Sequence, residues 1–241
     1  MASNPFFNEK TLEKNIGSMD TANSEQMTVA GAVNKSFILL TVLLVTASYS
    51  WIYPSPILMI GGMIGGLVCA VWASFQPQKS SWLAPAYAAF EGLFVGSISA
   101  MYALKFNGIV FNAITLTLAI LFTLLMAYKY QWIKVTEKFR AGVVAATGAI
   151  CIVYLISFAL SFFNIQVPYL HSGGMIGIGI SLAIIGVAAM NLLLDFDNFD
   201  KGEQLGAPKY MEWNAAMGLL ITLVWLYLEI LRLLSKLNSR N

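Results

Sequence analysis

Five acidic residues lie within or at the ends of long apolar stretches: Glu91, Asp195, Asp197, Glu212 and Glu229. An ionised carboxylate in the middle of a bilayer costs roughly 2.5–3.5 kcal/mol, so such residues usually face the interior of a helix bundle or a water-filled cavity. The chemistry open to them is the binding of protons or cations. These carboxyls are therefore the candidate functional groups of the chain.

Asp195 and Glu212 are the two acids whose positions suggest a pair. Asp195 follows Asn191 by four residues on one helix face, and this polar stripe is expected to face the interior. Asp197 is rotated by about 200° from Asp195 and is expected at the membrane interface. Glu212 begins the next apolar stretch at the same membrane edge as Asp195, so their carboxyls can meet.

Two carboxyls held close together in a dry site cannot both ionise cheaply, so they share one proton near neutral pH. We expect such a pair to act as a pH-responsive latch. With the shared proton the pair holds its two helices together, and without it the charges repel or recruit a cation. The alternative is that Asp195 and Glu212 both reach solvated headgroups at their helix ends.

Two further acids lie deeper in apolar stretches. Glu91 stands about nine residues into its stretch, roughly 13 Å along a helix, and is expected to tune the same ion pathway. Glu229 lies near the far end of the last stretch. We expect it to form an ion pair at the membrane interface with Arg232, three residues later on the same helix.

Motifs for catalysis or for a resident metal ion are absent from the sequence. If Asp195 began a calcium-binding EF-hand loop, Asp200 would stand where that loop requires glycine, and Gly206 where it requires glutamate. The sequence contains neither a serine-protease nor an intramembrane aspartyl-protease motif. We therefore expect no enzymatic activity, no cofactor and no certain metal site.

The elements that position these acids are predicted to be transmembrane helices. The chain is 58% hydrophobic and only 11% charged, whereas soluble domains are about 25% charged. Apolar runs of roughly 18–25 residues, long enough to cross about 30 Å of hydrocarbon, alternate with short polar breaks. They lack the alternation of a β-barrel, so the predicted fold is an all-α polytopic membrane protein. The seven predicted spans are 36–53, 56–76, 82–105, 108–128, 141–163, 173–199 and 209–236.

Three segments follow from this pattern. Residues 1–35 are predicted to form a disordered or surface-lying tail, 36–236 the transmembrane domain and 237–241 a short tail. Most Lys and Arg residues fall on the side of the amino terminus, which places that terminus in the cytoplasm by the positive-inside rule, although the basic carboxyl tail argues weakly against this.

A net charge of +2 without a basic patch makes nucleic acid a poor candidate partner. The expected partner is the lipid bilayer.

Glycines at intervals of four recur in three of the predicted spans. In lipid, small residues at this spacing let helix backbones approach closely. We expect close packing within one chain, and a dimer interface is the alternative. The glycines are Gly61, Gly62, Gly65, Gly66, Gly92 and Gly96, with Gly173 and Gly177 in the sixth span.

Three sequence features resemble the transmembrane Bax inhibitor motif family, in its bacterial, longer-tailed branch. They are Glu91-Gly92-Leu93-Phe94-Val95-Gly96, Asp195-Phe196, and the last span from Glu212-Trp213 to Trp225-Leu226-Tyr227-Leu228-Glu229-Ile230-Leu231-Arg232. The resemblance implies a last helix wrapped by the preceding six. It also implies a pH-dependent calcium leak, controlled by one acid on each of the last two helices, in the bacterial plasma membrane.

The resemblance assigns the sixth-helix acid to Asp195 but leaves the seventh-helix acid open. Tyr210-Met211-Glu212-Trp213 and Leu226-Tyr227-Leu228-Glu229-Ile230 both match the family pattern, and depth in the membrane favours Glu212. Some members latch this pair with a basic residue in the second helix. Residues 56–76 contain no Lys or Arg, so that residue has no counterpart there.

Two functions are consistent with the sequence. The first is a leak pathway for calcium or protons, gated by Asp195 with Glu212 and tuned by Glu91. The second is a non-conducting membrane regulator that binds a membrane protease or other membrane proteins through its glycine faces and amino-terminal tail. Ion flux into liposomes separates the two functions.

Overall fold

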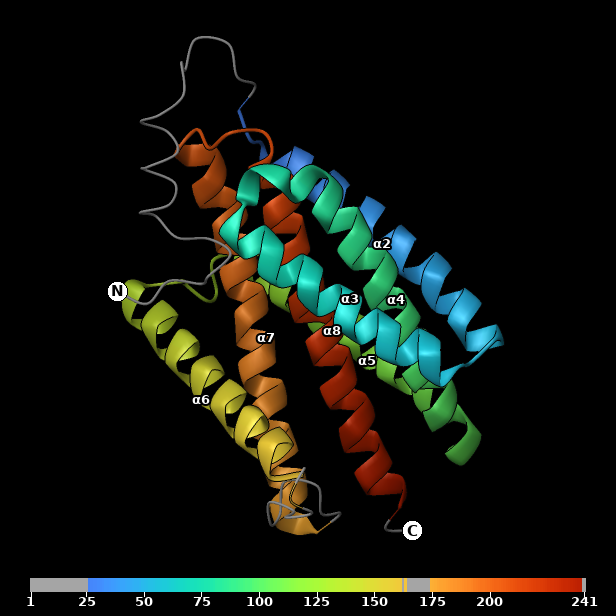
Figure 1. The fold of residues 1–241 in the computed structure, drawn as a ribbon. Coiled ribbons are helices and arrows are strands. Elements are labelled where there is room, and N and C mark those ends of the chain that lie inside the picture. The colour runs from blue at the N-terminus through green and yellow to red at the C-terminus, as the bar shows by residue number, and fades with distance from the viewer. Residues whose placement is uncertain (1–25, 162, 164–173, 240–241) are drawn as a thin grey trace. The chain divides into compact units, whose positions relative to one another are not determined.

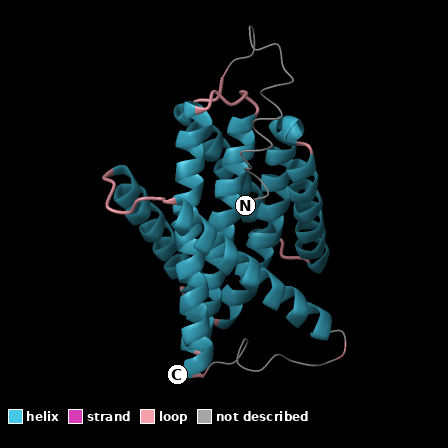
Figure 2. Cartoon of the chain, turned by 90° about the vertical axis from the view of Figure 1, so that its left-hand side faces the viewer, coloured by secondary structure: helices cyan, strands magenta, loops and turns pink. Residues whose placement is uncertain are grey.

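The structure, a computed structural model, describes residues 26–161, 163 and 174–239. Within these residues every regular element is a helix, and short loops join the helices (Figures 1 and 2). The only β-type contact among them is an isolated antiparallel bridge between Gln26 and Pro208. The elements are α2 (Val29–Ile52), α3 (Pro56–Phe75), the 3-10 helix η1 (Pro77–Lys79), α4 (Ser80–Lys105), α5 (Ile109–Lys129), α6 (Glu137–Ser161), α7 (Met175–Gln204) and α8 (Met211–Asn238).

Seven helices in the described part of the chain are long and apolar enough to cross a membrane, which confirms the predicted all-α polytopic fold. In six of the seven, less than half of the most apolar window is buried inside the protein, as is usual for helices whose outer faces meet lipid. The last helix, α8, is the most enclosed of the seven, because 56% of its most apolar window is buried. This agrees with the central last helix that the family resemblance implies.

The first helix starts earlier than predicted. Thr28 caps α2, because its Oγ1 accepts a 2.9 Å hydrogen bond from the backbone N–H of Gly31. The helix therefore begins at Val29, and the predicted tail boundary at residue 35 is wrong. The polar residues before Ser36 were read as a tail because nothing in the sequence shows which of them find partners. Residues 1–25 lie outside the described residues.

The last helices also run beyond their predicted ends. α7 continues to Gln204 instead of ending at 199, and α8 continues to Asn238, which places part of the predicted 237–241 tail in a helix. Charged side chains at the end of a span can leave the hydrocarbon without ending the helix. Hydropathy alone therefore marks the end of the apolar run and not the end of the helix.

The chain divides into two compact units, and both α7 and α8 contribute to each. The first, which we call the amino-terminal unit, comprises 3–104 with 195–221, and thus α2, α3, α4, the end of α7 and the start of α8. The second, the carboxyl-terminal unit, comprises 105–194 with 222–241, and thus α5, α6, the start of α7 and the end of α8.

Glycines let α3 and α4 pack closely in the amino-terminal unit. A Cβ atom added at Gly62 would lie 2.6 Å from the carbonyl oxygen of Phe90, and one added at Gly65 would meet the ring of the same residue. At Gly66 it would lie 2.8 Å from the carboxylate of Glu91. The predicted packing role is thus confirmed for these glycines. It is wrong for Gly61, which has open space around it among the described residues.

A second glycine contact joins α4 to α2. Added Cβ atoms at Gly92 and Gly96 would overlap Thr46 and the backbone of Ala47, so no larger residue fits without moving the helices apart. Ser50 Oγ donates a 3.4 Å hydrogen bond to the carbonyl oxygen of Gly92 across the same contact. The predicted role of both glycines in packing is confirmed.

Candidate functional site

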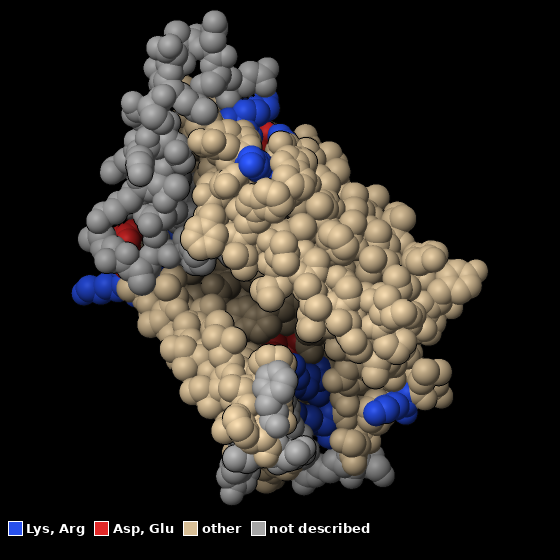
Figure 3. Space-filling model, viewed as in Figure 1, with Lys and Arg blue, Asp and Glu red and all other residues tan. Residues whose placement is uncertain are grey.

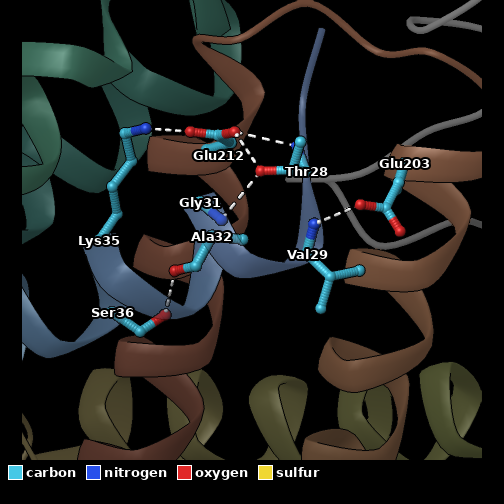
Figure 4. A network of polar contacts seen from close by, with 8 residues as sticks. All are labelled: Thr28, Val29, Gly31, Ala32, Lys35, Ser36, Glu203 and Glu212. Carbon is cyan, nitrogen blue, oxygen red and sulfur yellow. Dashed lines mark hydrogen bonds and ion pairs between the residues drawn. The ribbon is translucent and has the colours of Figure 1, made fainter.

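Glu212 is fully buried at the start of α8 and is held by donors from α2 and the segment before it. Its Oε1 accepts hydrogen bonds from the backbone N–H of Thr28 at 2.9 Å and from Thr28 Oγ1 at 3.2 Å. Its Oε2 forms an ion pair with Lys35 Nζ (Figure 4). Every partner in this set donates a hydrogen bond to the carboxylate. Such an arrangement favours the ionised form of Glu212.

The amino terminus of α2 receives carboxylates from two other helices. Besides Glu212 of α8, Glu203 of α7 accepts a 3.0 Å hydrogen bond from the backbone N–H of Val29 (Figure 4). Unpaired N–H groups and the helix dipole make such a terminus attractive to anions. Gly31 leaves the space that this contact needs, because an added Cβ there would overlap the Glu212 carboxylate.

The segment before α2 is tied to the loop between α7 and α8. The backbone N–H of Met27 donates a 2.7 Å hydrogen bond to the carbonyl oxygen of Ala207, and Gln26 bridges to Pro208. The side chain of Met27 is buried. We call residues 26–28 the strap, because with Lys35 they hold the start of α8 against α2.

Lys35 is the residue of this site that the sequence interpretation missed. The resemblance led to a search for a basic residue only in 56–76, whereas the structure supplies one from the preceding helix. Two signals were available. Lys35 is the only cation within the apolar run of α2, and it lies seven residues, or about two helical turns, after Thr28 on the same face.

Asp195 is buried in α7 and faces α8. Its Oδ1 lies 3.8 Å from the position that a Cβ atom on Gly218 would occupy. Asp197 is more exposed and forms a 3.4 Å ion pair with Lys201, one turn later. The predicted order, with Asp195 inside and Asp197 nearer the surface, is confirmed.

Asp195 of α7 and Glu212 of α8 belong to the same unit. They lie at different levels along α8. Gly218, beside Asp195, lies six residues after Glu212, or roughly 9 Å along the helix. The neighbours of Glu212 are Thr28 and Lys35, so its charge is balanced by a cation. A proton shared directly between Asp195 and Glu212 stays a prediction.

Glu91 lies where α3 meets α4. Tyr87, one turn earlier on α4, donates a hydrogen bond to its carboxyl, and Gly66 of α3 faces the same carboxyl. Glu91 is only half-buried, whereas Tyr87 is buried. A role for Glu91 in tuning an ion pathway stays a prediction.

Glu229 belongs to the carboxyl-terminal unit and has its own cation. Arg232 Nη1 lies 2.9 Å from Glu229 Oε1, which confirms the predicted ion pair. Tyr154 of α6 donates a 2.7 Å hydrogen bond to the same oxygen. The Glu229 side chain is buried, so this ion pair is an interior contact rather than the interfacial one expected.

Aromatic and basic side chains of the kind found at membrane surfaces lie near the start of α8. Trp72 and Trp82 pack edge to face with ring centroids 5.3 Å apart, and Lys79 lies over the Trp72 ring. Trp and Lys gather where spans meet the headgroups. Ser80, at the same turn, donates a 3.3 Å hydrogen bond to Asn214 of α8, so the first turn of α8 is near this surface.

Comparison with known proteins identifies the family. No curated protein and no solved structure matches the chain. A family model described as Bax inhibitor 1 like matches residues 4–239, nearly the whole sequence. This match agrees with the seven apolar helices and with the motifs around Glu91, Asp195 and the last helix. The chain therefore belongs to the Bax inhibitor 1 like family.

Proposed function

We propose that the protein is a pH-dependent leak channel for calcium ions or protons. In this proposal Asp195 binds the passing ion, and the Glu212–Lys35 pair with the strap closes the entrance. The observation that carries it is the fully buried Glu212 carboxylate, held by α2 and the strap, in a unit that contains a second buried acid, Asp195. Packing alone does not require two buried acids at this end of α7 and α8.

The proposed gate opens when Glu212 takes up a proton. An ionised Glu212 attracts Lys35 and the amino terminus of α2, whereas a neutral one loses the ion pair and most of the interaction with the helix dipole. The charged groups at this site are Lys35, which forms the ion pair, and Glu203, which accepts a hydrogen bond at the amino terminus of α2. Burial raises the pKa of the adjacent Tyr210 hydroxyl, which stays neutral across the physiological range. Acid therefore opens the gate, the reverse of a latch that a shared proton holds closed.

The proposed location is the bacterial plasma membrane, with the Glu212 entrance on the cytoplasmic side. The bias of Lys and Arg residues toward the amino-terminal side supports this orientation. Acidification of the cytoplasm would then open the entrance. Glu91, at the contact of α3 and α4, is proposed to adjust the field along the pathway.

Flux through purified protein in liposomes tests the leak. We expect calcium or proton entry above that of empty liposomes, lost in Asp195→Asn and independent of pH in Glu212→Gln. Glu137→Gln, which removes an exposed acid at the start of α6, is the matched control and is expected to behave as the wild type. If the wild type gives no more flux than empty liposomes, the leak is wrong, and a non-conducting regulator that binds a membrane protease takes its place.

A further inference from the structure

Three glutamates of the long helices are buried or half-buried, and they differ in the cations beside them. Glu212 forms an ion pair with Lys35, and Glu229 forms one with Arg232. Glu91 of α4 interacts with no cation among the described residues. The negative charges of the first two glutamates are therefore balanced, whereas a negative charge on Glu91 is not.

The helices packed around Glu91 contain no cation that can balance it. α3 has no Lys or Arg, and Figure 3 shows an uncharged surface over this helix. α2, which also packs on α4, carries only Lys35, and that side chain is already paired with Glu212. The only cation of α4 itself, Lys105, follows Glu91 by 14 residues, or roughly 21 Å along the helix.

A single hydrogen-bond donor also leaves the ionised form of Glu91 poorly stabilised. Tyr87, which is buried one turn earlier on α4, donates to the carboxyl. On its other side the carboxyl lies against Gly66 of α3, where an added Cβ would be 2.8 Å from Oε2. Gly66 lies in the middle of α3, and N–H groups there already bond to carbonyl oxygens four residues earlier. Glu212, by contrast, has two donors from Thr28 besides its lysine.

The position of Glu91 along its span makes an unbalanced charge costly. It lies nine residues, or roughly 13 Å, beyond Trp82, one of the aromatic residues of the kind found at membrane surfaces. The exposed side chains beside this contact include Phe90 and Leu67, which are apolar. A carboxyl in such surroundings becomes neutral by binding a proton. The neutral acid can still accept the hydrogen bond from Tyr87 through its carbonyl oxygen.

We infer that Glu91 is a proton-binding site at the contact of α3 and α4, and that it is occupied at neutral pH. The ligand is the proton itself, held as the neutral carboxylic acid beside Tyr87 and Gly66. The titratable groups of the two helices nearest to it are Tyr87 and Cys69, the latter being the one titratable side chain of α3.

This site behaves in the opposite way to the proposed gate. Glu212 is ionised at neutral pH and takes up a proton in acid, whereas Glu91 is neutral and loses its proton in alkali. The proposed effect of Glu91 on the field along the pathway would therefore appear only in alkali. The inference stands apart from the leak, because the proton on Glu91 can be measured whether or not the protein conducts.

Reaction with dicyclohexylcarbodiimide measures this proton. The apolar reagent adds to a protonated carboxyl: the acid proton moves to one nitrogen, the carboxyl oxygen bonds to the central carbon, and rearrangement leaves a stable N-acylurea. For the full chain in liposomes at neutral pH, we expect peptide mass spectrometry to find the label at Glu91 and not at Glu212 or Glu229. Labelling is expected to fall in alkali by up to about tenfold per pH unit, the limit for one titrating proton.

A tyrosine variant separates protonation from access of the reagent. The Tyr87 hydroxyl donates to the carboxyl and favours its ionised form, so labelling of Glu91 in Tyr87→Phe is expected to persist to higher pH. Tyr102→Phe, which removes a hydroxyl eleven residues after Glu91 on the same helix, is the matched control and is expected to keep the wild-type profile. A Tyr87→Phe profile that is unchanged, or moved to lower pH, would overturn the site.

Infrared difference spectroscopy decides the test if the reagent does not reach Glu91. The spectrum of the wild type minus that of Glu91→Gln is expected to contain the C=O stretch of a protonated carboxyl at neutral pH, and to lose it in alkali. Glu212→Gln is the matched control, and its difference spectrum is expected to contain carboxylate bands instead. Absence of the protonated C=O band from the Glu91 spectrum, or labelling of Glu212 as strong as that of Glu91, would overturn the inference.

Discussion

Glu212 can be buried because Lys35 balances its charge. The Glu212 side chain is fully buried and that of Lys35 is 15% exposed, so neither group is well solvated. A buried ion pair contributes little by itself, whereas removing one partner leaves an uncompensated charge. The stability of the site thus depends on both residues being present or both being replaced.

Replacement of Lys35 by Met is expected to destabilise the protein by about 3–5 kcal/mol, the cost of breaking a buried ion pair. Thermal unfolding in detergent measures the change. The double variant Lys35→Met with Glu212→Leu is expected to recover most of the loss, because it leaves no unpaired charge. Equal unfolding temperatures for wild type and Lys35→Met would show that the ion pair does not form.

Gly31 is predicted to be needed for the same contact. In Gly31→Ala the added Cβ overlaps the Glu212 carboxylate, and overpacking of this kind costs about 1–3 kcal/mol. Gly61→Ala is the matched control, because Gly61 also lies in a helix but faces open space. Thermal unfolding is expected to show a loss for Gly31→Ala, and no loss or a gain for Gly61→Ala. The same result for both variants would contradict the assignment.

The acids and the local partner of Glu229 were predictable from the sequence, whereas the partners of Glu212 were not. Asp195, Glu212 and Glu229 are conspicuous because a carboxylate in an apolar stretch is costly, and the ion pair of Glu229 with Arg232 is local to one helix. Lys35 and Glu212 are far apart in sequence. Only tertiary packing brings them together, and no periodicity within one helix reveals such a contact.

At the scale of whole helices, the spans were predictable and some of their ends were not. Bilayer thickness sets the length of an apolar run, so α3 and α5 match their predicted ranges to within one residue. The start of α2 depends on a cap at Thr28 and on acids from α7 and α8. The hydropathy pattern does not reveal those contacts. The predicted tail therefore extended to residue 35, although α2 begins at Val29.

Thr28→Val is predicted to loosen the start of α2. The change removes the hydrogen bond from Gly31 N–H to the cap and the side-chain hydrogen bond to Glu212, while the backbone N–H of residue 28 still donates. Loss of an N-cap costs about 1 kcal/mol. Hydrogen exchange is expected to accelerate in residues 29–35 and to stay unchanged in α5. Unchanged exchange at 29–35 would show that the cap does not hold this turn.

At the scale of the whole molecule, two sets of polar contacts between helices stand out among the described residues of this chain. One joins α2, α7 and α8 around Glu212, and the other joins α6, α7 and α8 around Arg232. In the first set, Lys35 balances the charge of Glu212. A single proton on Glu212 is therefore enough to break this ion pair. The proposed pH response therefore belongs to the first set.

The pH dependence of ion flux in proteoliposomes tests this gate most directly, with wild type and Lys35→Met compared over the same pH series. We predict that wild-type flux rises as the pH on the Glu212 side falls, by up to about tenfold per pH unit, the limit for one titrating proton. In Lys35→Met the ion pair is absent, so flux is predicted to be high and to vary little with pH. A wild-type flux that falls on acidification, or a Lys35→Met profile identical to the wild type, would contradict a gate closed by Glu212 and Lys35.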